Sequence, residues 1–162
     1  MILLTTSRTE ILAYILTEKG LKLSLAESCT GGLIGSQITD ISGSSAFFLG
    51  SAVTYSNESK ERLIGVSHQS LAENGAVSET VAKEMAEGTL EAYGSDIAAS
   101  VTGIAGPNGG TPEKPVGTVW MAVTDGKRTI AFENHFTGSR KEIRKRTAEV
   151  LIDRLIEFAE EM

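Results

Sequence analysis

The sequence is poor in the residue types that build disulfide frameworks and metal sites. It contains one cysteine, Cys29, and two histidines, His68 and His135, among 162 residues. A single cysteine cannot form an internal disulfide, and no cluster of Cys and His has the spacing of a metal site. We therefore expect no bound metal, and such sparse use of cysteine is typical of a reducing cytoplasm.

Basic charge and long apolar runs are also scarce. The chain has 15 Lys and Arg against 21 Asp and Glu, which gives a net charge of −6. That balance argues against bulk binding to nucleic acid or to an anionic membrane. No segment approaches the length of a bilayer span, and the N-terminus lacks the pattern of a signal peptide. We expect a cytoplasmic protein with no nucleic-acid or membrane partner.

The length and composition are those of one globular domain over residues 1–162. Hydrophobic residues make up 41% of the chain and charged residues 22%, which suits a protein that buries a proper core. Helical and strand patterns alternate along the chain, and one hairpin signal follows them. The predicted fold class is α/β, a three-layer α/β/α sandwich with a mixed, mostly parallel sheet.

Capping signals and apolar periodicity place the individual elements. The capping box Ser7-x-x-Glu10 and the stop signal Gly20 predict a helix over Arg8–Lys19. Four more helices are predicted over residues 31–39, 57–64, 79–93 and from 140 onward. Strands are predicted at 21–27, at 47–55 as a buried strand, at 97–101, and at 117–123 and 127–136 as a hairpin.

Three places just after predicted strands draw attention, because ligands of open α/β sheets bind beyond the carboxyl ends of the strands. They are Ser28 with Thr30, Tyr55 with Lys60, and residues 102–107. The last of these is rich in glycine, but it matches neither the dinucleotide fingerprint nor a P-loop. Its glycines allow a bound group to approach the backbone closely.

Ser28 lies in a hydroxyl-rich turn that opens a predicted helix. Unpaired N–H groups and partial positive charge at such a place favour an anion, so Ser28 is a candidate for chemistry. The alternative is that Ser28 or Thr30 only caps the helix. The neighbouring Cys29 is either a thiol with a lowered pKa or, as is commoner, a buried structural residue. Because successive side chains point apart, Ser28 and Cys29 should not both face one ligand.

A serine needs a base to take its proton, and the chain offers few candidates. His68 is predicted in a polar loop and His135 near a strand end, which favours structural or solvated roles for both. Lys60 is the better candidate, because a desolvated lysine can lose its proton near neutral pH. The alternative for Lys60 is a solvated lysine on a helix.

Basic residues crowd the start of the last predicted helix. Arg140 and Arg144 share one helical face there, so their guanidinium groups could converge on one anion such as a phosphate. The alternative is a solvated basic face without a ligand.

These residues lie in segments that together resemble the C-terminal domain of the competence/damage-inducible CinA family, which also occurs as a stand-alone nicotinamide-nucleotide amidase. The resemblance covers essentially the whole chain, with one departure at Leu49, where the family often has a glycine. The matching segments are Ala26-Glu27-Ser28-Cys29-Thr30-Gly31-Gly32, Gly43-Ser44-Ser45 with Phe48, Val53-Thr54-Tyr55-Ser56-Asn57 with Lys60, Thr102-Gly103-Ile104-Ala105-Gly106-Pro107-Asn108-Gly109-Gly110, Lys114-Pro115-Val116-Gly117-Thr118-Val119, and Phe136-x-Gly138-x-Arg140 with Arg144.

The resemblance implies hydrolysis of nicotinamide mononucleotide to nicotinate mononucleotide and ammonia, without a metal or organic cofactor. It implies Ser28 as the nucleophile and Lys60 as its base, which agrees with the reading of the residues themselves. It further suggests a homodimer or a larger homo-oligomer. A second hypothesis is a non-catalytic module that binds a nucleotide or a competence-associated partner in the same pocket, and the presence of both Ser28 and Lys60 favours the enzyme.

The other expected site residues have supporting roles. Backbone N–H groups from Ser28 to Gly31, including that of Thr30, are expected to stabilise the oxyanion. The remaining assignments are Tyr55 and Ser45 as relays or orienting groups, Thr102 and Gly103 beside the nicotinamide or ribose, and Arg140, aided by Arg144, at the phosphate.

Overall fold

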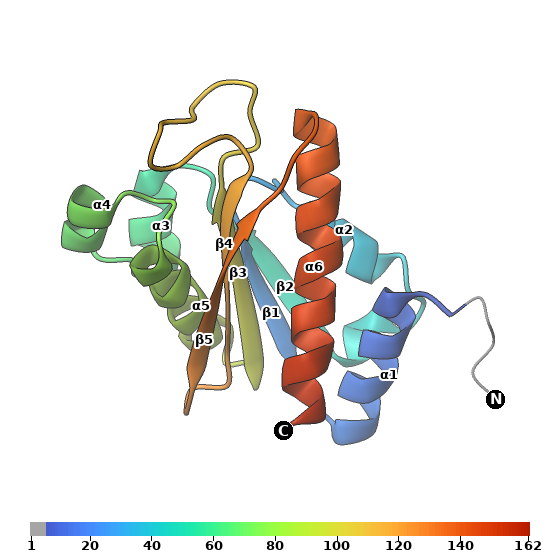
Figure 1. Cartoon of the computed structure of the whole chain (residues 1–162). Helices are drawn as coiled ribbons and strands as arrows, with labels where there is room; N and C mark the ends of the chain where they lie inside the picture. Colours follow the sequence, from blue (N-terminus) through green and yellow to red (C-terminus); the bar gives the residue numbers. More distant parts are fainter. Residues whose placement is uncertain (1–5) are drawn as a thin grey trace.

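The computed structural model describes residues 6–162 and shows a five-stranded sheet between two layers of helices (Figure 1). The strand order is β2-β1-β3-β4-β5. The strands are β1 (Leu23–Glu27), β2 (Phe48–Val53), β3 (Ile97–Gly103), β4 (Thr118–Thr124) and β5 (Thr129–His135). One face is covered by α1 (Arg8–Lys19), α2 (Leu33–Thr39) and α6 (Arg140–Glu160), and the other side carries α3 (Asn57–Ile64), α4 (His68–Asn74) and α5 (Glu79–Tyr93). A short 3₁₀ turn, η1 (Ser44–Ala46), precedes β2.

The sheet is mixed, as predicted, and the parallel pairings lie on one side of it. β1 pairs in parallel with both β2 and β3, whereas β4 is antiparallel to β3 and to β5. Four strands therefore run in one direction, but parallel pairings do not outnumber antiparallel ones. The term "mostly parallel" holds for strand direction only, because the hairpin of β4 and β5 extends the sheet through antiparallel pairing.

Alternation along the central strand β3 sorts large from small side chains. Ile97 and Val101 lie in the main apolar core with residues of α1, α2 and α6. Ala98 is buried and Ser100 donates a hydrogen bond from its Oγ to the carbonyl of Ala82 in α5, at 2.6 Å. Small side chains on this face let α5 pack close to the sheet, so the larger core lies between the sheet and α6.

The boundaries of several elements match the prediction. α1 begins at a capping box of Ser7 and Glu10 and ends at Gly20, which has a φ of 66°. The predicted helices ending at Gly65 and Gly94, the buried strand β3 and the hairpin are also present.

Two predictions about local structure were wrong. β2 was predicted to be buried, but it is an edge strand in which Leu49 and Val53 are exposed. It pairs with β1 alone, so no second strand covers its outer side. His68 begins the helix α4 instead of lying in a loop, and Ser67 caps that helix. At seven residues, α4 is too short to produce a clear helical period.

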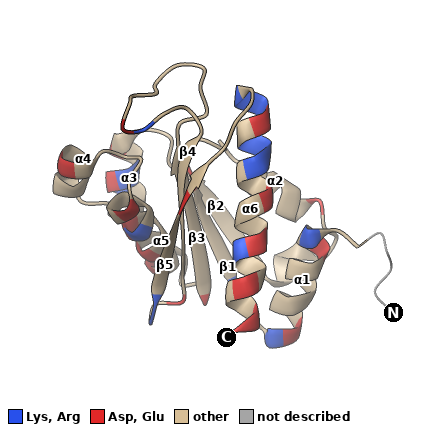
Figure 2. Cartoon of the chain, in the orientation of Figure 1, with Lys and Arg blue, Asp and Glu red and all other residues tan. Residues whose placement is uncertain are grey.

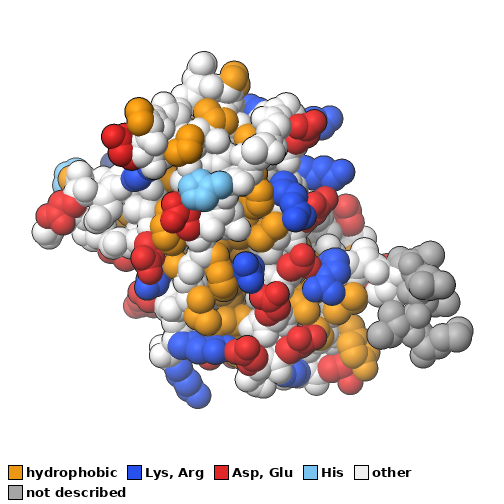
Figure 3. Space-filling view, in the orientation of Figure 1, with side chains coloured by type: hydrophobic (Ala, Val, Ile, Leu, Met, Phe, Trp, Pro, Cys, Tyr) orange, Lys and Arg blue, Asp and Glu red, His pale blue; other side chains and the backbone are white. Residues whose placement is uncertain are grey.

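Charge is distributed unevenly along α6 (Figure 2). Its first turns carry Arg140, Lys141, Arg144, Lys145 and Arg146, whereas acidic residues dominate its last turns. The face over β5 and α6 mixes apolar side chains with charges of both signs (Figure 3). None of the helices in residues 6–162 is both long and apolar enough to span a membrane.

Candidate active site

Ser28 and Lys60 meet at the carboxyl end of the parallel strands. Ser28 directly follows β1, and Lys60 projects from the first turns of α3. The Lys60 Nζ lies 3.0 Å from the Ser28 Oγ. Lys60 is 1% exposed and Ser28 is 9% exposed, so the pair is shielded from bulk water. A lysine and a serine from segments 32 residues apart thus form a candidate base–nucleophile pair.

Burial of the Lys60 amine favours its neutral form. Burial lowers the pKa of Lys60 from its ordinary value of 10.5. In either protonation state its Nζ donates to the carbonyl of Thr54 at 2.8 Å and to the carbonyl of Tyr55 at 3.4 Å. A neutral amine has two N–H donors and one lone pair. Two carbonyls can take the donors, which leaves the lone pair to accept the Ser28 proton.

Local sequence explains why Lys60 reaches this point. Ser56 caps α3 by accepting a hydrogen bond from the Ser59 N–H, at 3.1 Å. The end of α3 then packs directly on α5 at Gly88. A Cβ atom at position 88 would lie 1.7 Å from the Ile64 carbonyl oxygen, so only glycine permits this approach. The glycine inside α5 thereby helps to set the position of α3 and of Lys60.

The turn after Ser28 is shaped by two glycines and one buried carboxylate. Gly31 and Gly32 have φ values of 58° and 100°, which side chains other than glycine rarely adopt. Glu27 is fully buried on the α2 face of β1. Its carboxylate accepts four hydrogen bonds, from Thr30 Oγ1, Ile34 N–H, Gly35 N–H and Ser51 Oγ. Glu27 therefore caps α2 and holds the turn in place.

Only part of the expected oxyanion site is available. The Ser28 N–H donates to the Val101 carbonyl and the Gly31 N–H donates to the Ser28 carbonyl, both at 3.1 Å. Among residues 6–162, no backbone carbonyl accepts from the N–H of Cys29 or Thr30. These two groups, rather than all four from Ser28 to Gly31, are the candidate oxyanion donors.

Cys29 is not activated. Burial raises the pKa of the Cys29 thiol to about 11. The thiol therefore stays protonated at neutral pH and is a poor nucleophile. The structure favours the structural alternative for this residue.

A pocket of about 270 Å³ opens beside the Ser28–Lys60 pair. It brings together six predicted site residues and five others. The lining residues are Ser28, Cys29, Tyr55, Asn57, Lys60, Ala76, Val77, Thr102, Gly103, Ala105 and Arg140. The hydroxyl of Thr102 donates to the Ala76 carbonyl at 2.9 Å, so it ties the wall of the pocket together. At the rim, Arg140 donates from Nη1 to the Gly106 carbonyl at 2.9 Å and from Nη2 to the Tyr55 hydroxyl at 3.2 Å.

Ser45 does not join this group. It lies in η1, before β2. Because β2 runs parallel to β1, with Phe48 opposite Leu23 and Val53 opposite Glu27, the start of β2 lies at the amino end of β1. Ser45 is thus at the opposite end of the sheet from Ser28, and its expected place at the site was wrong.

Three other predicted residues stand behind the turn instead of lining the pocket. Thr30 is fully buried, and its hydroxyl donates to Glu27 Oε1 at 2.8 Å, which directs its side chain away from the pocket. Gly31 shapes the turn through its positive φ. Arg144 donates from Nε to the Cys29 carbonyl at 3.1 Å and from Nη2 to the Thr30 carbonyl at 2.9 Å.

Sequence reasoning missed Glu27, Asn57, Ala76 and Val77. A carboxylate ending a buried strand next to a glycine-rich turn was a usable signal for Glu27. Asn57 was visible within a motif but was treated only as part of a helix cap. Ala76 and Val77 carry no chemical signal, and the link between α4 and α5 brings them to the pocket.

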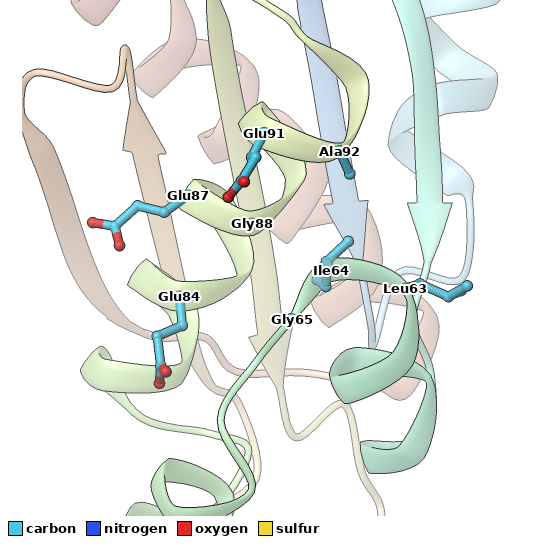
Figure 4. Close-up of a pocket in the computed structure, with 8 residues that line it drawn as sticks. All are labelled: Leu63, Ile64, Gly65, Glu84, Glu87, Gly88, Glu91 and Ala92. Atoms are coloured by element: carbon cyan, nitrogen blue, oxygen red, sulfur yellow. The ribbon is translucent and has the colours of Figure 1, made fainter.

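A second hollow has no comparable chemistry among its lining residues. It lies between α3 and α5, has a volume of about 520 Å³ and is drawn in Figure 4. It is lined by Leu63, Ile64, Gly65, Glu84, Glu87, Gly88, Glu91 and Ala92, which include no Ser, Cys, His or Lys. Its three carboxylates do not converge on one point (Figure 4). No group of three or more His, Cys, Asp or Glu in the described residues is placed to hold a metal ion.

Comparisons with known sequences agree with this architecture. A family model described as the CinA C-terminal domain matches residues 5–159. A CinA-like protein of Endomicrobium trichonymphae is 55% identical over 141 residues, which covers 87% of this chain and 33% of the relative. A CinA-like protein of Geobacter metallireducens is also 55% identical, over 87% of this chain and 34% of the relative. The chain spans about a third of the length of these curated relatives.

Solved structures with the same fold cover nearly the whole chain. A competence-damaged protein (CinA) superfamily protein from Klebsiella pneumoniae superposes with a TM-score of 0.91 at 32% identity, covering 97% of this chain and 100% of that one. A competence/damage inducible protein from Agrobacterium tumefaciens gives a TM-score of 0.87 at 40% identity, covering 95% and 97%.

Proposed function

This chain belongs to the CinA C-terminal domain family, and on that premise we propose that it is an amidase that hydrolyses the carboxamide of nicotinamide mononucleotide. The observation that carries the proposal is the 3.0 Å contact between the Ser28 Oγ and the buried Lys60 Nζ. A non-catalytic binding module has no need to bury a lysine amine against a serine hydroxyl, because burial of an amine without a compensating role is costly.

In the first half of the proposed reaction, Ser28 becomes acylated. Neutral Lys60 takes the Ser28 hydroxyl proton as the Oγ attacks the carboxamide carbon. The carbonyl oxygen gains negative charge, which the N–H groups of Cys29 and Thr30 stabilise. The C–N bond then breaks, Lys60 returns the proton to the nitrogen, and ammonia leaves. The products of this half are an ester at Ser28 and a neutral Lys60.

In the second half, water restores the enzyme. Lys60 takes one proton from a water molecule while its oxygen attacks the ester carbon. The bond from that carbon to the Ser28 Oγ breaks, the Oγ takes the proton back from Lys60, and the acid leaves. The net reaction consumes one amide and one water and yields one acid and one ammonia. Tyr55 lines the pocket and is a candidate to orient the substrate.

Arg140 is the proposed phosphate contact. Its guanidinium lies at the pocket rim. The start of α6 is a weaker anion site than the sequence suggested, because the Glu142 carboxylate already accepts a hydrogen bond from the Ser139 N–H, at 2.9 Å. That carboxylate partly neutralises the helix terminus. A mononucleotide phosphate is therefore proposed to meet the Arg140 side chain rather than the helix-start N–H groups.

The proposal includes the expected setting of the enzyme. The reaction as written needs only the nucleotide and water, in the cytoplasm, and the active form is proposed to be a homodimer or a larger homo-oligomer. Light scattering on the purified chain measures that assembly directly, and a monomeric mass at working concentration contradicts it.

Ammonia release from nicotinamide mononucleotide by the purified protein tests the function. Free nicotinamide and the dinucleotide are the substrate controls, and Ser28→Ala is the enzyme control. We expect turnover of the mononucleotide that disappears in the variant. A folded protein that binds the mononucleotide but never releases ammonia contradicts the amidase and favours the binding module.

A further inference from the structure

Arg144 makes contacts that a substrate-binding arginine would not need. It is half-buried on α6 and reaches the turn that follows Ser28, where its Nε and Nη2 donate to the carbonyls of Cys29 and Thr30 at 3.1 and 2.9 Å. It does not line the Ser28 pocket. A planar guanidinium that spans two successive carbonyls fixes the orientation of both peptide groups.

The orientation of a carbonyl sets the direction of the N–H group in the same peptide. In a trans peptide the C=O of one residue and the N–H of the next lie in one plane and point in opposite directions. The Cys29 carbonyl and the Thr30 N–H belong to the same peptide group, which is trans. Because Arg144 binds the Cys29 carbonyl, the Thr30 N–H points away from Arg144.

Each candidate oxyanion donor belongs to a peptide group whose carbonyl accepts a hydrogen bond. The Cys29 N–H belongs to the peptide group whose carbonyl, that of Ser28, accepts from the Gly31 N–H. The Thr30 N–H belongs to the peptide group whose carbonyl accepts from Arg144. One peptide is thus fixed by the backbone of the turn and the other by a side chain from α6.

From these contacts we propose that Arg144 is a positioning residue that holds the Thr30 N–H toward the oxyanion formed at the Ser28 site. The positive charge of Arg144 adds to this effect, since it polarises the Cys29–Thr30 peptide and strengthens its N–H as a donor. The inference rests on the proposed amidase function and replaces the expectation that Arg144 binds the substrate phosphate.

The two roles for Arg144 predict different kinetics. A phosphate contact acts in substrate binding, so its loss raises KM for the mononucleotide and leaves the phosphate-free riboside unaffected. A contact that positions an oxyanion donor acts in the transition state. Its loss lowers kcat on both substrates by the same factor and leaves KM nearly unchanged.

The test compares Arg144→Ala and Arg144→Lys with Lys145→Ala, which removes one positive charge from the exposed neighbouring position. We expect Arg144→Ala to lower kcat on both substrates about 100-fold, as loss of an oxyanion donor does elsewhere. Arg144→Lys should recover only part of the rate, because one ammonium cannot bridge two carbonyls in a fixed plane. Lys145→Ala should retain the wild-type kcat. Added guanidinium ion should restore part of the activity of Arg144→Ala and none of that of Ser28→Ala.

A substrate-independent measurement separates failure of this inference from failure of the proposed function. The rate at which a fluorophosphonate labels Ser28 depends on the nucleophile and the oxyanion donors, whatever the natural substrate is. Slower labelling in Arg144→Ala than in Lys145→Ala supports the inference even if the wild type does not hydrolyse the mononucleotide. Wild-type kcat and labelling in Arg144→Ala overturn it while leaving the amidase intact. A rise in KM confined to the mononucleotide overturns it in favour of phosphate binding.

Discussion

Ser139 directly precedes α6, and Ser28 begins the turn that leads into α2. The two serines have different roles. At α6, the Ser139 Oγ accepts from the Glu142 N–H at 3.2 Å and Glu142 accepts from the Ser139 N–H, which is a complete capping box. At α2, Gly32 occupies the capping position and makes no side-chain cap. The Ser28 Oγ instead lies against Lys60.

The difference shows that a serine near a helix start can act as a nucleophile when another residue caps the helix. The Glu27 carboxylate satisfies the N–H groups of Ile34 and Gly35, a task that a capping residue usually performs. Alternation along the strand places Glu27 on the α2 face and the next residue, Ser28, on the α3 face. The capping group and the nucleophile are therefore neighbours in sequence that act on opposite sides of the sheet.

The largest contrast is expected between Ser28→Ala and Ser139→Ala. The first should lower kcat/KM by at least about 10⁴-fold, because no other group can form the ester, and should leave the melting temperature nearly unchanged since no cap is lost. The second should keep wild-type kcat/KM and lose about 1 kcal/mol of folding free energy. Steady-state kinetics and urea unfolding of both variants measure the contrast. Equal loss of activity in Ser28→Ala and Ser139→Ala would contradict the different roles assigned to the two serines.

Lys60 should be irreplaceable by another cation. Lys60→Arg should be nearly as inactive as Lys60→Ala, because a guanidinium keeps its proton and cannot act as a base near neutral pH. Wild-type turnover in Lys60→Arg would show that charge alone is needed, and with it the base role of Lys60 would be lost.

The dependence of kcat/KM on pH should follow the ionisation of Lys60. Because burial lowers the pKa of Lys60, kcat/KM of the wild type should rise with pH through that lowered pKa, below 10.5, and then level off as the amine becomes neutral. Ser139→Ala should show the same rising limb. A flat profile, or a fall over that range, contradicts a neutral lysine as the base.

Glu27→Gln should cost more stability than Glu142→Gln. The amide would present N–H groups to donors that now meet carboxylate oxygens, inside a fully buried site, at a cost of about 3 kcal/mol. Glu142 is exposed at its capping box, so the same change there should cost about 1 kcal/mol or less. Urea unfolding of the two variants gives both numbers, and equal costs contradict the assignment of Glu27 as the buried cap of α2.

Arg140→Ala should act on binding. Loss of a charge-assisted phosphate contact costs on the order of 2 kcal/mol, which raises KM for the mononucleotide about 30-fold. The riboside should be affected little. Equal proportional losses of kcat/KM on both substrates would move Arg140 to a structural role through its contacts with Gly106 and Tyr55.

The smallest effect is expected from Cys29→Ala. With its thiol protonated and buried, the Cys29 side chain contributes packing but no chemistry, and alanine keeps the backbone N–H, so most of the activity should remain. Iodoacetamide should label native Cys29 slowly for the same reason. An inactive Cys29→Ala beside an active Ser28→Ala would reverse the identity of the nucleophile.

Many helix boundaries could be predicted from the sequence because they depend on residues close together in the chain. Capping boxes at Ser7 and Ser139 and stop glycines at positions 20, 65 and 94 set helix boundaries that the structure retains. The edge position of β2 was not readable, because strand order depends on pairings between distant segments. The same limit applies to Ser45, whose end of the sheet follows from the direction of β2 relative to β1.

Within the candidate site, residue type predicted chemistry better than it predicted orientation. Ser28, Lys60, Tyr55, Thr102, Gly103 and Arg140 were expected at one pocket and do line one. The side chain of Arg144 was also expected to meet the substrate. Its hydrogen bonds to two backbone carbonyls direct it elsewhere, and such contacts arise only when the turn after β1 and α6 are packed together.

Partitioning of the reaction with hydroxylamine tests whether Ser28 forms an ester with the substrate. Hydroxylamine intercepts an ester intermediate after ammonia has left. We predict that nicotinate mononucleotide hydroxamate replaces the acid as the hydroxylamine concentration increases, while kcat/KM for ammonia release stays constant. The Ser28 peptide from quenched enzyme should carry the mass of the substrate less ammonia. Acid as the sole product at every hydroxylamine concentration, with no adduct at Ser28, would contradict an ester at Ser28 and indicate direct attack by water.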